Sequence, residues 1–370
     1  MSFLDTQVIK QVKPKGRRHW NFRESARRVL ESLAPSLQIT IAATVAYLIA
    51  HYLLGHPIPF LAVTVSITSL GLSRDARPRR ILQTSLGMVT GIALSELFQV
   101  VFDKGYWQLP VLILFVLLAA RFVTNSATFA LAAATQSALV YLTVAPPGGP
   151  FMRSVDGLIG AGISLAATAL IPRDPRGLAK NDAEKLFDVF LDSLSSIRAA
   201  LRSTDVASAD ASLLTVRRTQ PLLDNWRMSL DSAIAISRIS PFLRKHQGEL
   251  QGQTRLLRGM DLATRNLRVV VRRIDFLIRD GQARPYLADL LEQIEDATRV
   301  LLQSFEDPER QQDAQDLYVG IIHQLDPKKF GIADQLREAS VLLLLRPLLV
   351  DLLCAAGMSE DEARAELPAI

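Results

Sequence analysis

Residues 36–72 read SLQITIAATVAYLIAHYLLGHPIPFLAVTVSITSLGL, a stretch that contains no Asp, Glu, Lys or Arg. A second uncharged stretch covers residues 122–152. Charged residues cover the surface of a soluble domain, so a domain of this size does not leave such long stretches uncharged. The two stretches therefore exclude a purely soluble protein and predict segments that lie in lipid.

Charge is divided unevenly along the chain, which has 370 residues, 49% of them hydrophobic, and a formal net charge of +5. Residues 1–172 carry 15 Lys and Arg against 7 Asp and Glu, whereas residues 173–370 carry 27 against 30. The first part is therefore +8 and the second −3, which sums to +5. This division predicts three regions: a basic segment over 1–34, a transmembrane domain over 35–172 and a cytoplasmic helical domain over 173–370.

The transmembrane domain is expected to cross the bilayer six times. A spanning helix needs about 20 mostly apolar residues. The candidate spans are 36–54, 57–72, 81–101, 108–123, 127–145 and 154–171. With six crossings, nearly all basic residues fall on one side, and the positive-inside rule places both termini in the cytoplasm. We therefore expect a multi-pass protein of the inner (plasma) membrane whose first partner is the lipid bilayer.

Residues 19–33 form the predicted amphipathic part of the N-terminal segment. Val29, Leu30 and Leu33 share one side of a helix, and arginines supply cationic heads on the other. Such a helix could lie on the anionic inner leaflet, or it could pack as a cap on the cytoplasmic domain. Both interpretations stay open from the sequence alone.

Small residues predict close packing of two spans. Gly87 and Gly91 form a GxxxG motif in the third span, and Gly157 and Gly160 lie on a small-residue face of the sixth. Small residues let helix backbones approach closely in lipid. We expect the third and sixth spans to pack together, within one chain or across an oligomer. A six-helix bundle is small, so a homo-oligomer, most simply a dimer, is expected.

The C-terminal half is predicted to be an all-α bundle with long antiparallel hairpins. Apolar residues recur at alternating spacings of 3 and 4 over 180–202 and again over 255–280. Further helices are expected over 208–240, 285–305, 309–325 and 331–355. The very apolar segment 341–353 is too short to span and is broken by charged residues, so a buried bundle helix is preferred over a membrane-docked segment.

Seven arginines lie between residues 255 and 279. They could form an anion or lipid-headgroup site. The preferred interpretation is a solvated face paired with acids on nearby helices such as 286–299, because this half of the chain is slightly acidic. Nucleic-acid binding is not expected, since no aromatic residues interleave with the arginines.

The sequence lacks the motifs of the common enzyme classes. It contains no GxxxxGK[ST], HExxH, CxxC or GxSxG, and its single cysteine excludes an internal disulfide. His51 and His56 lie near the outer end of the first span, but two histidines alone are poor evidence for a metal. We therefore expect no enzyme activity, no cofactor and no metal site.

Ionisable residues at membrane depth are expensive and mark pathways or partners. Glu96 in the third span is the main candidate for coupling proton entry to anion export. Asp156 at the start of the sixth span and Arg121 at the end of the fourth are further candidates for the substrate path or coupling. For Asp156 a helix cap is preferred, and Arg121 could be only a topology anchor. Asn125 and Gln136 are polar positions of the fifth span that could line an aqueous path or bridge helices. The loop residues Arg74, Arg77, Arg79 and Arg80 would attract anions to the cytoplasmic mouth.

The membrane half resembles a known family. The residues that carry the resemblance are the basic loop after the second span, RILQTSLGMVTG at 80–91, and LIPRDP at 170–175, followed by a long helical tail. This pattern resembles the fusaric acid resistance and aromatic acid exporter superfamily, and its layout is similar to that of plant aluminium-activated malate transporters. The resemblance implies proton-driven export of small organic, often aromatic, carboxylates. A passive organic-anion channel and a membrane-anchored scaffold whose tail binds a protein partner are the alternatives.

Overall fold

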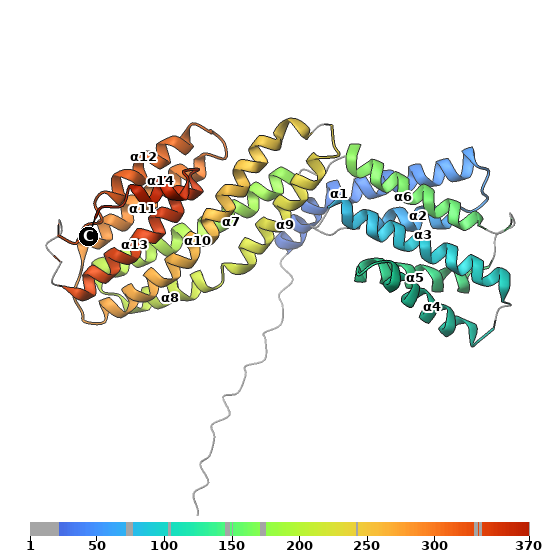
Figure 1. Ribbon diagram of the computed structural model, residues 1–370, viewed down its shortest axis with the longest axis horizontal. Helices are drawn as coiled ribbons and strands as arrows, with labels where there is room; N and C mark the ends of the chain where they lie inside the picture. The colour runs from blue at the N-terminus through green and yellow to red at the C-terminus, as the bar shows by residue number, and fades with distance from the viewer. Residues whose placement is uncertain are drawn as a thin grey trace, which may run out of the picture.

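The computed structural model describes residues 22–71, 77–102, 105–144, 149, 151–170, 175–241, 243–328, 332 and 335–369. Within these ranges the regular structure is entirely helical, as predicted. Figure 1 shows two helical groups end to end: α1 to α6 form one, and α7 to α14 form the other. Each group has its own hydrophobic clusters, and the largest cluster lies wholly within residues 179–363.

The first group contains one helix for each predicted span. Their bounds are α1 Phe22–Leu48, which continues into a π-helical turn over Ile49–Leu53, α2 Phe60–Leu70, α3 Pro78–Val101, α4 Gln108–Val123, α5 Ala127–Leu142 and α6 Met152–Leu170. Among the described residues, only Ser32–Leu53 and Pro78–Val101 are long and apolar enough to cross a membrane by themselves, whereas α2, α4 and α5 are shorter apolar helices. Helical structure in the predicted spans is thus confirmed, and six crossings stay a prediction.

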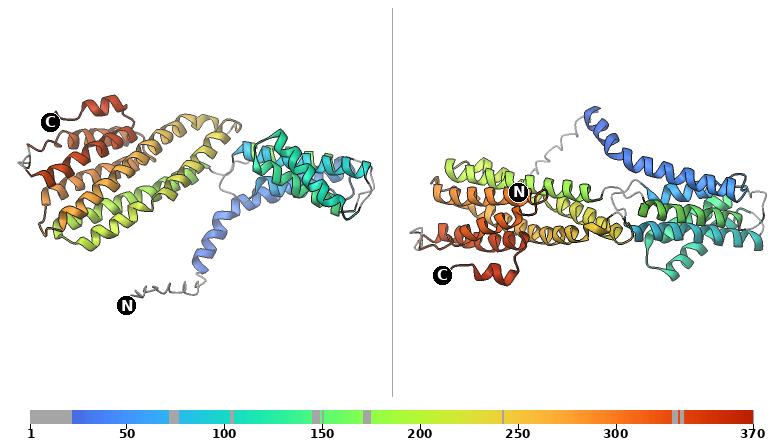
Figure 2. Two further views of the ribbon diagram at one scale, coloured as in Figure 1. Left: turned by 60° about the horizontal axis from the view of Figure 1, so that its bottom comes forward. Right: turned by 90° about the horizontal axis from the view of Figure 1, so that it is seen from above.

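The amphipathic segment and the first span form one continuous helix, α1, with Pro35 inside it. The N-terminal part of α1 leaves the bundle and points away from it (Figure 2). Leu30 on this part is 71% exposed, and Val29 and Leu33 are also exposed. Exposure of this apolar side agrees with a helix lying on the membrane surface and not with a cap packed on the cytoplasmic domain.

Large apolar side chains of the first group face outward. Leu114, Phe115 and Leu118 of α4 are exposed, whereas the buried positions of the group include Ala46, Ala62 and other small residues. A water-soluble bundle places its large apolar residues inside. The reversed arrangement is what a bundle surrounded by lipid requires.

The predicted packing of α3 against α6 is confirmed, but most of the glycines named in the prediction contact other helices. A Cβ on Gly87 would lie 2.5 Å from the carbonyl oxygen of Phe129, and one on Gly91 would overlap that of Ala133, so the GxxxG of α3 packs against α5. Gly157 of α6 faces Ile92 of α3. Gly160 of α6 instead abuts the backbone of α2, where the carbonyl oxygen of Ala62 would be 2.5 Å away.

The second group is a bundle of long helices. Their bounds are α7 Pro175–Ser203, α8 Val206–Arg217, α9 Gln220–Ser237, a 3₁₀ turn Arg244–His246, α10 Gln247–Ile278, α11 Pro285–Gln303, α12 Arg310–Ile322, α13 Leu336–Ala355 and α14 Glu360–Ala365. The predicted helix over 208–240 is two helices, because Pro221 lacks an N–H and starts the new helix α9. The short helix α14 was not predicted; Ser359 and Glu362 form the capping box that starts it.

The apolar periodicities correctly identify the core of this bundle. Phe187, Leu194 and Leu201 of α7 are completely buried, as are Met260 and Leu267 of α10. The apolar segment 341–353 is part of the buried helix α13, as preferred. Arg346 within it donates hydrogen bonds to the carbonyl oxygens of Leu325 and Pro368, which satisfies its charged head.

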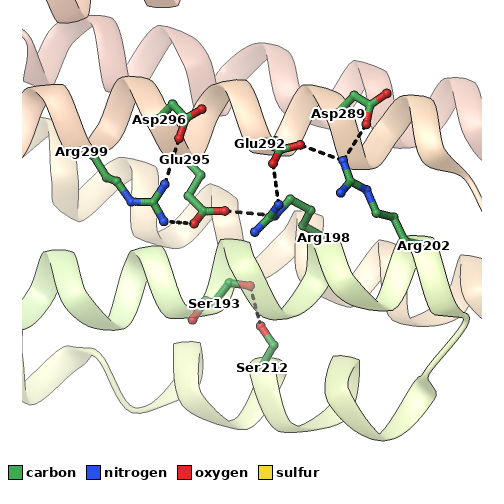
Figure 3. A network of polar contacts seen from close by, with 9 residues as sticks. All are labelled: Ser193, Arg198, Arg202, Ser212, Asp289, Glu292, Glu295, Asp296 and Arg299. Atoms are coloured by element: carbon green, nitrogen blue, oxygen red, sulfur yellow. Dashed lines mark hydrogen bonds and ion pairs between the residues drawn. The ribbon is translucent and has the colours of Figure 1, made fainter.

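Two of the seven arginines between residues 255 and 279 pair with acids among the described residues, and these acids are not the predicted ones on α11. Arg265 and Arg279 bind Asp261 and Asp275 one turn earlier on α10 itself. The acids of α11 bind arginines of α7 and α11 instead (Figure 3). The residues of that network are Arg198, Arg202, Asp289, Glu292, Glu295, Asp296 and Arg299.

Candidate functional site

Glu96 of α3 caps the N-terminus of α6. One carboxylate oxygen accepts a hydrogen bond from the backbone N–H of Arg153 at 3.2 Å. The other accepts from the backbone N–H of Ser154 at 3.1 Å and from its hydroxyl at 2.5 Å. Glu96 is buried, and the first N–H groups of a helix have no partner within the helix itself. The carboxylate supplies those missing acceptors and a favourable charge for the helix dipole.

Arg153 crosses from the start of α6 to the end of α5. Its buried guanidinium donates to the carbonyl oxygens of Val140 at 2.9 Å, Thr143 at 3.5 Å and Val144. The last carbonyl groups of a helix lack intrahelical donors and favour a cation. Arg153 therefore closes the end of α5 while Glu96 closes the start of α6, and the two charges lie close together.

Asp156 does not cap α6, contrary to the prediction, because the helix begins at Met152, one turn earlier. Its side chain is only 6% exposed, and its Oδ1 lies 2.6 Å from Nδ1 of His56, whose side chain is 13% exposed. His56 lies between the π-helical turn and α2. The carbonyl oxygen of His56 lies 2.8 Å from Nδ1 of His51, and this contact fixes the segment that carries His56.

The capping role predicted for Asp156 is therefore wrong, whereas the coupling role predicted for Glu96 stays a prediction. The predicted coupling residue Glu96 is a helix cap, and the predicted cap Asp156 is a buried partner of a histidine. The sequence did not predict that Arg153 and His56 belong to this end of the bundle. We call the five polar residues that meet there the outer polar cluster: His56, Glu96, Arg153, Ser154 and Asp156. Four of these five residues can carry charge. Their shared position near the outer ends of the predicted spans was the signal in the sequence that could have identified the cluster.

The other predicted residues lie at the opposite ends of the same helices. Arg121 at the end of α4 donates to the carbonyl oxygen of Asn125 at 2.8 Å, and both residues are exposed. The hydroxyl of Ser126 donates to Gln83 near the start of α3 at 3.2 Å, which places the turn between α4 and α5 beside that helix. This end is therefore separate from the outer polar cluster.

The basic loop is described only in part. Arg77 and Arg79 are exposed and Arg80 is half-buried at the start of α3, whereas Arg74 lies outside the described residues. Together with Arg121, they give this end of the bundle a positive surface that attracts anions.

Gln136 lies on α5 between the two ends and is buried. Its Nε2 has no hydrogen-bond partner among the described residues. A buried amide donor without an acceptor is unfavourable, so the position suits a group that brings an acceptor, such as a solute carboxylate or water.

The described residues include no group of three or more His, Cys, Asp and Glu side chains that could hold a metal ion. The outer polar cluster holds one guanidinium, two carboxylates and one imidazole. The charges of Arg153 and Glu96 cancel. The net charge of the cluster therefore depends on how many protons the pair of His56 and Asp156 holds. Proton binding is the chemistry that this arrangement can perform.

Residues 45–167 match the family described as "Fusaric acid resistance protein-like". An uncharacterized protein of Corynebacterium glutamicum is 28% identical over 355 residues, 94% of this chain and 91% of the relative. A protein of Mycobacterium tuberculosis with the name "Putative arylamide transporter" is 26% identical over 159 residues, 41% of this chain and 45% of the relative. These similarities support the predicted family for residues 45–167 and favour a membrane transporter.

Proposed function

We propose that this chain exports small organic carboxylates, chiefly aromatic ones, across the inner membrane. The premise is the match of residues 45–167 to the fusaric acid resistance protein-like family. The observation that carries the proposal is a buried, charged cluster at one end of a bundle whose large apolar side chains face outward. Charged groups are kept inside a membrane bundle where they serve a path or a coupling step.

The arrangement of charge along the bundle favours an anion as the solute. Exposed Arg77, Arg79 and Arg121 would raise the anion concentration at the cytoplasmic mouth. Buried Gln136 offers a donor farther along, among side chains apolar enough for an aromatic ring. The name of the mycobacterial relatives suggests neutral arylamides as a second solute class.

Proton coupling is the second part of the proposal. A membrane potential that is negative inside already drives an anion outward by about 2.3 kcal/mol per charge per 100 mV. A channel could therefore export the same solute without protons. The outer polar cluster favours a coupled exporter, because a channel needs no buried group that binds protons.

The test uses full-length protein in proteoliposomes loaded with labelled phthalate, an aromatic dicarboxylate that stays charged at pH 7 and leaks little. The potential is held at zero with equal potassium and valinomycin, and the outside is made acidic. A coupled exporter accelerates efflux under the pH gradient, and a channel gives the same efflux with or without it. Efflux no faster than from protein-free vesicles would overturn the transporter proposal and favour the scaffold.

Competition identifies the solute class in the same assay. Unlabelled benzoate inside the vesicles should slow phthalate efflux if aromatic carboxylates are substrates. Acetanilide, a neutral arylamide, should compete only if the site accepts the ring without the charge. The expected dimer is checked by light scattering of the detergent-solubilised protein, where a monomeric mass would contradict it.

A further inference from the structure

Two buried carboxylates lie at the outer end of the bundle, and their surroundings differ in a way that separates their roles. Glu96 accepts two hydrogen bonds from backbone N–H groups and one from a hydroxyl. All three donors belong to the start of α6, so Glu96 is tied to that helix as its cap. Asp156 has a different partner, His56, at 2.6 Å. Imidazole gains and loses a proton between pH 5 and 8.

The charged groups that face Asp156 come from three elements. Glu96 of α3 acts on it as a second negative charge, Arg153 is three residues earlier on α6, and His56 comes from the segment before α2. Arg153 is engaged by carbonyl oxygens of the α5 end and lies beside Glu96. Among these groups, the described contact between a carboxylate and an imidazole is that of Asp156 with His56.

We propose that His56 and Asp156 form the proton-binding site of the transporter, with Glu96 as a structural cap. The inference rests on the proposed transport function. A proton from the outer solution adds to the pair and changes its net charge from −1 to 0. The half-buried ring of His56 gives the pair access to that solution, whereas the carboxylate behind it is buried.

The position of the pair explains how proton binding reaches the helices. Asp156 directly precedes Gly157, where α6 contacts Ile92 of α3, and Gly160 one turn later abuts the backbone of α2. His56 lies just before α2. The pair therefore ties the start of α2 to α6 at the place where both helices pack most closely. Adding the proton turns a carboxylate–imidazole hydrogen bond into a carboxylate–imidazolium ion pair. The added proton thus strengthens the electrostatic tie in a low-dielectric site, which shifts the balance between two packings of α2 against α6.

The test compares two modes of phthalate movement in the proteoliposome assay. Net efflux driven by a pH gradient requires a proton carrier. Exchange of labelled for unlabelled phthalate at equal pH on both sides does not. Asp156→Asn and His56→Gln are expected to reduce net efflux to its rate without a gradient while leaving exchange close to that of the wild type. Asp156→Glu, which keeps a carboxyl group, should restore the response to pH.

The tail offers a matched control. His323 lies 2.8 Å from Glu366 and forms an exposed pair of the same chemistry outside the membrane bundle. His323→Gln should leave both modes unchanged. Net efflux that still follows the pH gradient in Asp156→Asn would overturn this site and leave the transporter proposal standing. Loss of exchange together with net efflux in that variant would show that the pair only braces the fold, and it would also overturn the site. A wild-type protein inactive in both modes would overturn the proposed function itself.

Discussion

The two helical groups bury opposite kinds of side chain. In the tail the largest fully buried residues include Trp226, Tyr318 and Phe187, whereas the first group buries many small residues beside a few large ones such as Leu112, and exposes many of its leucines. Water drives large apolar side chains into the tail's core. Lipid provides no such drive, so helices there depend on close backbone contact and on satisfied polar groups. The same helical architecture is therefore held together by different forces on the two sides of residue 172.

The largest expected effect concerns the glycines that allow that backbone contact. Gly91→Ala places a methyl group against the carbonyl of Ala133, which neither backbone can easily avoid. We expect it to reduce the free energy of unfolding by at least about 3 kcal/mol or to prevent folding, since overpacking commonly costs about 1–3 kcal/mol and occasionally more. Thermal unfolding in mild detergent measures the effect.

The control lies in the same group of helices. Gly162 of α6 has open space around its missing Cβ, so Gly162→Ala should be neutral or slightly stabilising because alanine favours a helix by up to about 1 kcal/mol over glycine. Equal losses in the two variants would contradict the view that backbone contact holds this group together.

The next effect compares two arginines of the tail that each bridge two carboxylates. Arg284 binds Asp280 and Glu338 and is 4% exposed. Arg202 binds Asp289 and Glu292 and is 46% exposed. Arg284→Met should lower the free energy of unfolding by about 3 kcal/mol, because it leaves a half-buried carboxylate without its partner. Arg202→Met should lower it far less than Arg284→Met does, since exposed pairs are screened by water. Chemical unfolding of the full chain in detergent, followed by tail fluorescence, separates them.

Sequence reasoning predicted the cores of both groups better than their polar contacts. Periodicity and lack of charge located α1 to α6 and the seams of α7 and α10, because burial follows directly from the order of residues along a helix. The partners of Arg198 or Asp156 depend on which helices become neighbours and where each one starts. The start of α6 at Met152 alone decides that Asp156 is not its cap. A single sequence does not specify such distances.

A pH dependence follows from the buried arginine of the tail. Hydrogen bonds from Arg284 hold the pKa of Asp280 well below its ordinary value. The folded state therefore gains stability from this carboxylate above the pKa of the unfolded chain, and it loses that stability as the pH falls toward the lower folded pKa. The free energies of unfolding of the wild type and of Asp280→Asn, measured as the pH is lowered, should converge at low pH. Parallel curves down to the lowest pH would contradict this assignment.

The smallest expected effect concerns Tyr286 in the same part of the tail. Burial, and next the negative charge of Glu338, raise its pKa to about 12. The raised pKa favours the neutral phenol, so its contribution to stability is complete below pH 10 and is lost as the pH rises toward 12. Burial also raises the pKa of Tyr318, so ultraviolet absorption should show at least two tyrosines fewer ionising near pH 10 than the unfolded chain shows, and Tyr286→Phe should remove one late component of the titration. Early ionisation of Tyr286 would contradict its burial.

The most direct test of the whole account is phthalate efflux from proteoliposomes at zero membrane potential, compared with and without an acidic outside. The account predicts that the pH gradient accelerates efflux through the wild-type protein and that Asp156→Asn abolishes the acceleration while exchange continues. Efflux that ignores the gradient in the wild type would contradict a proton-coupled exporter and identify the membrane group as a passive path.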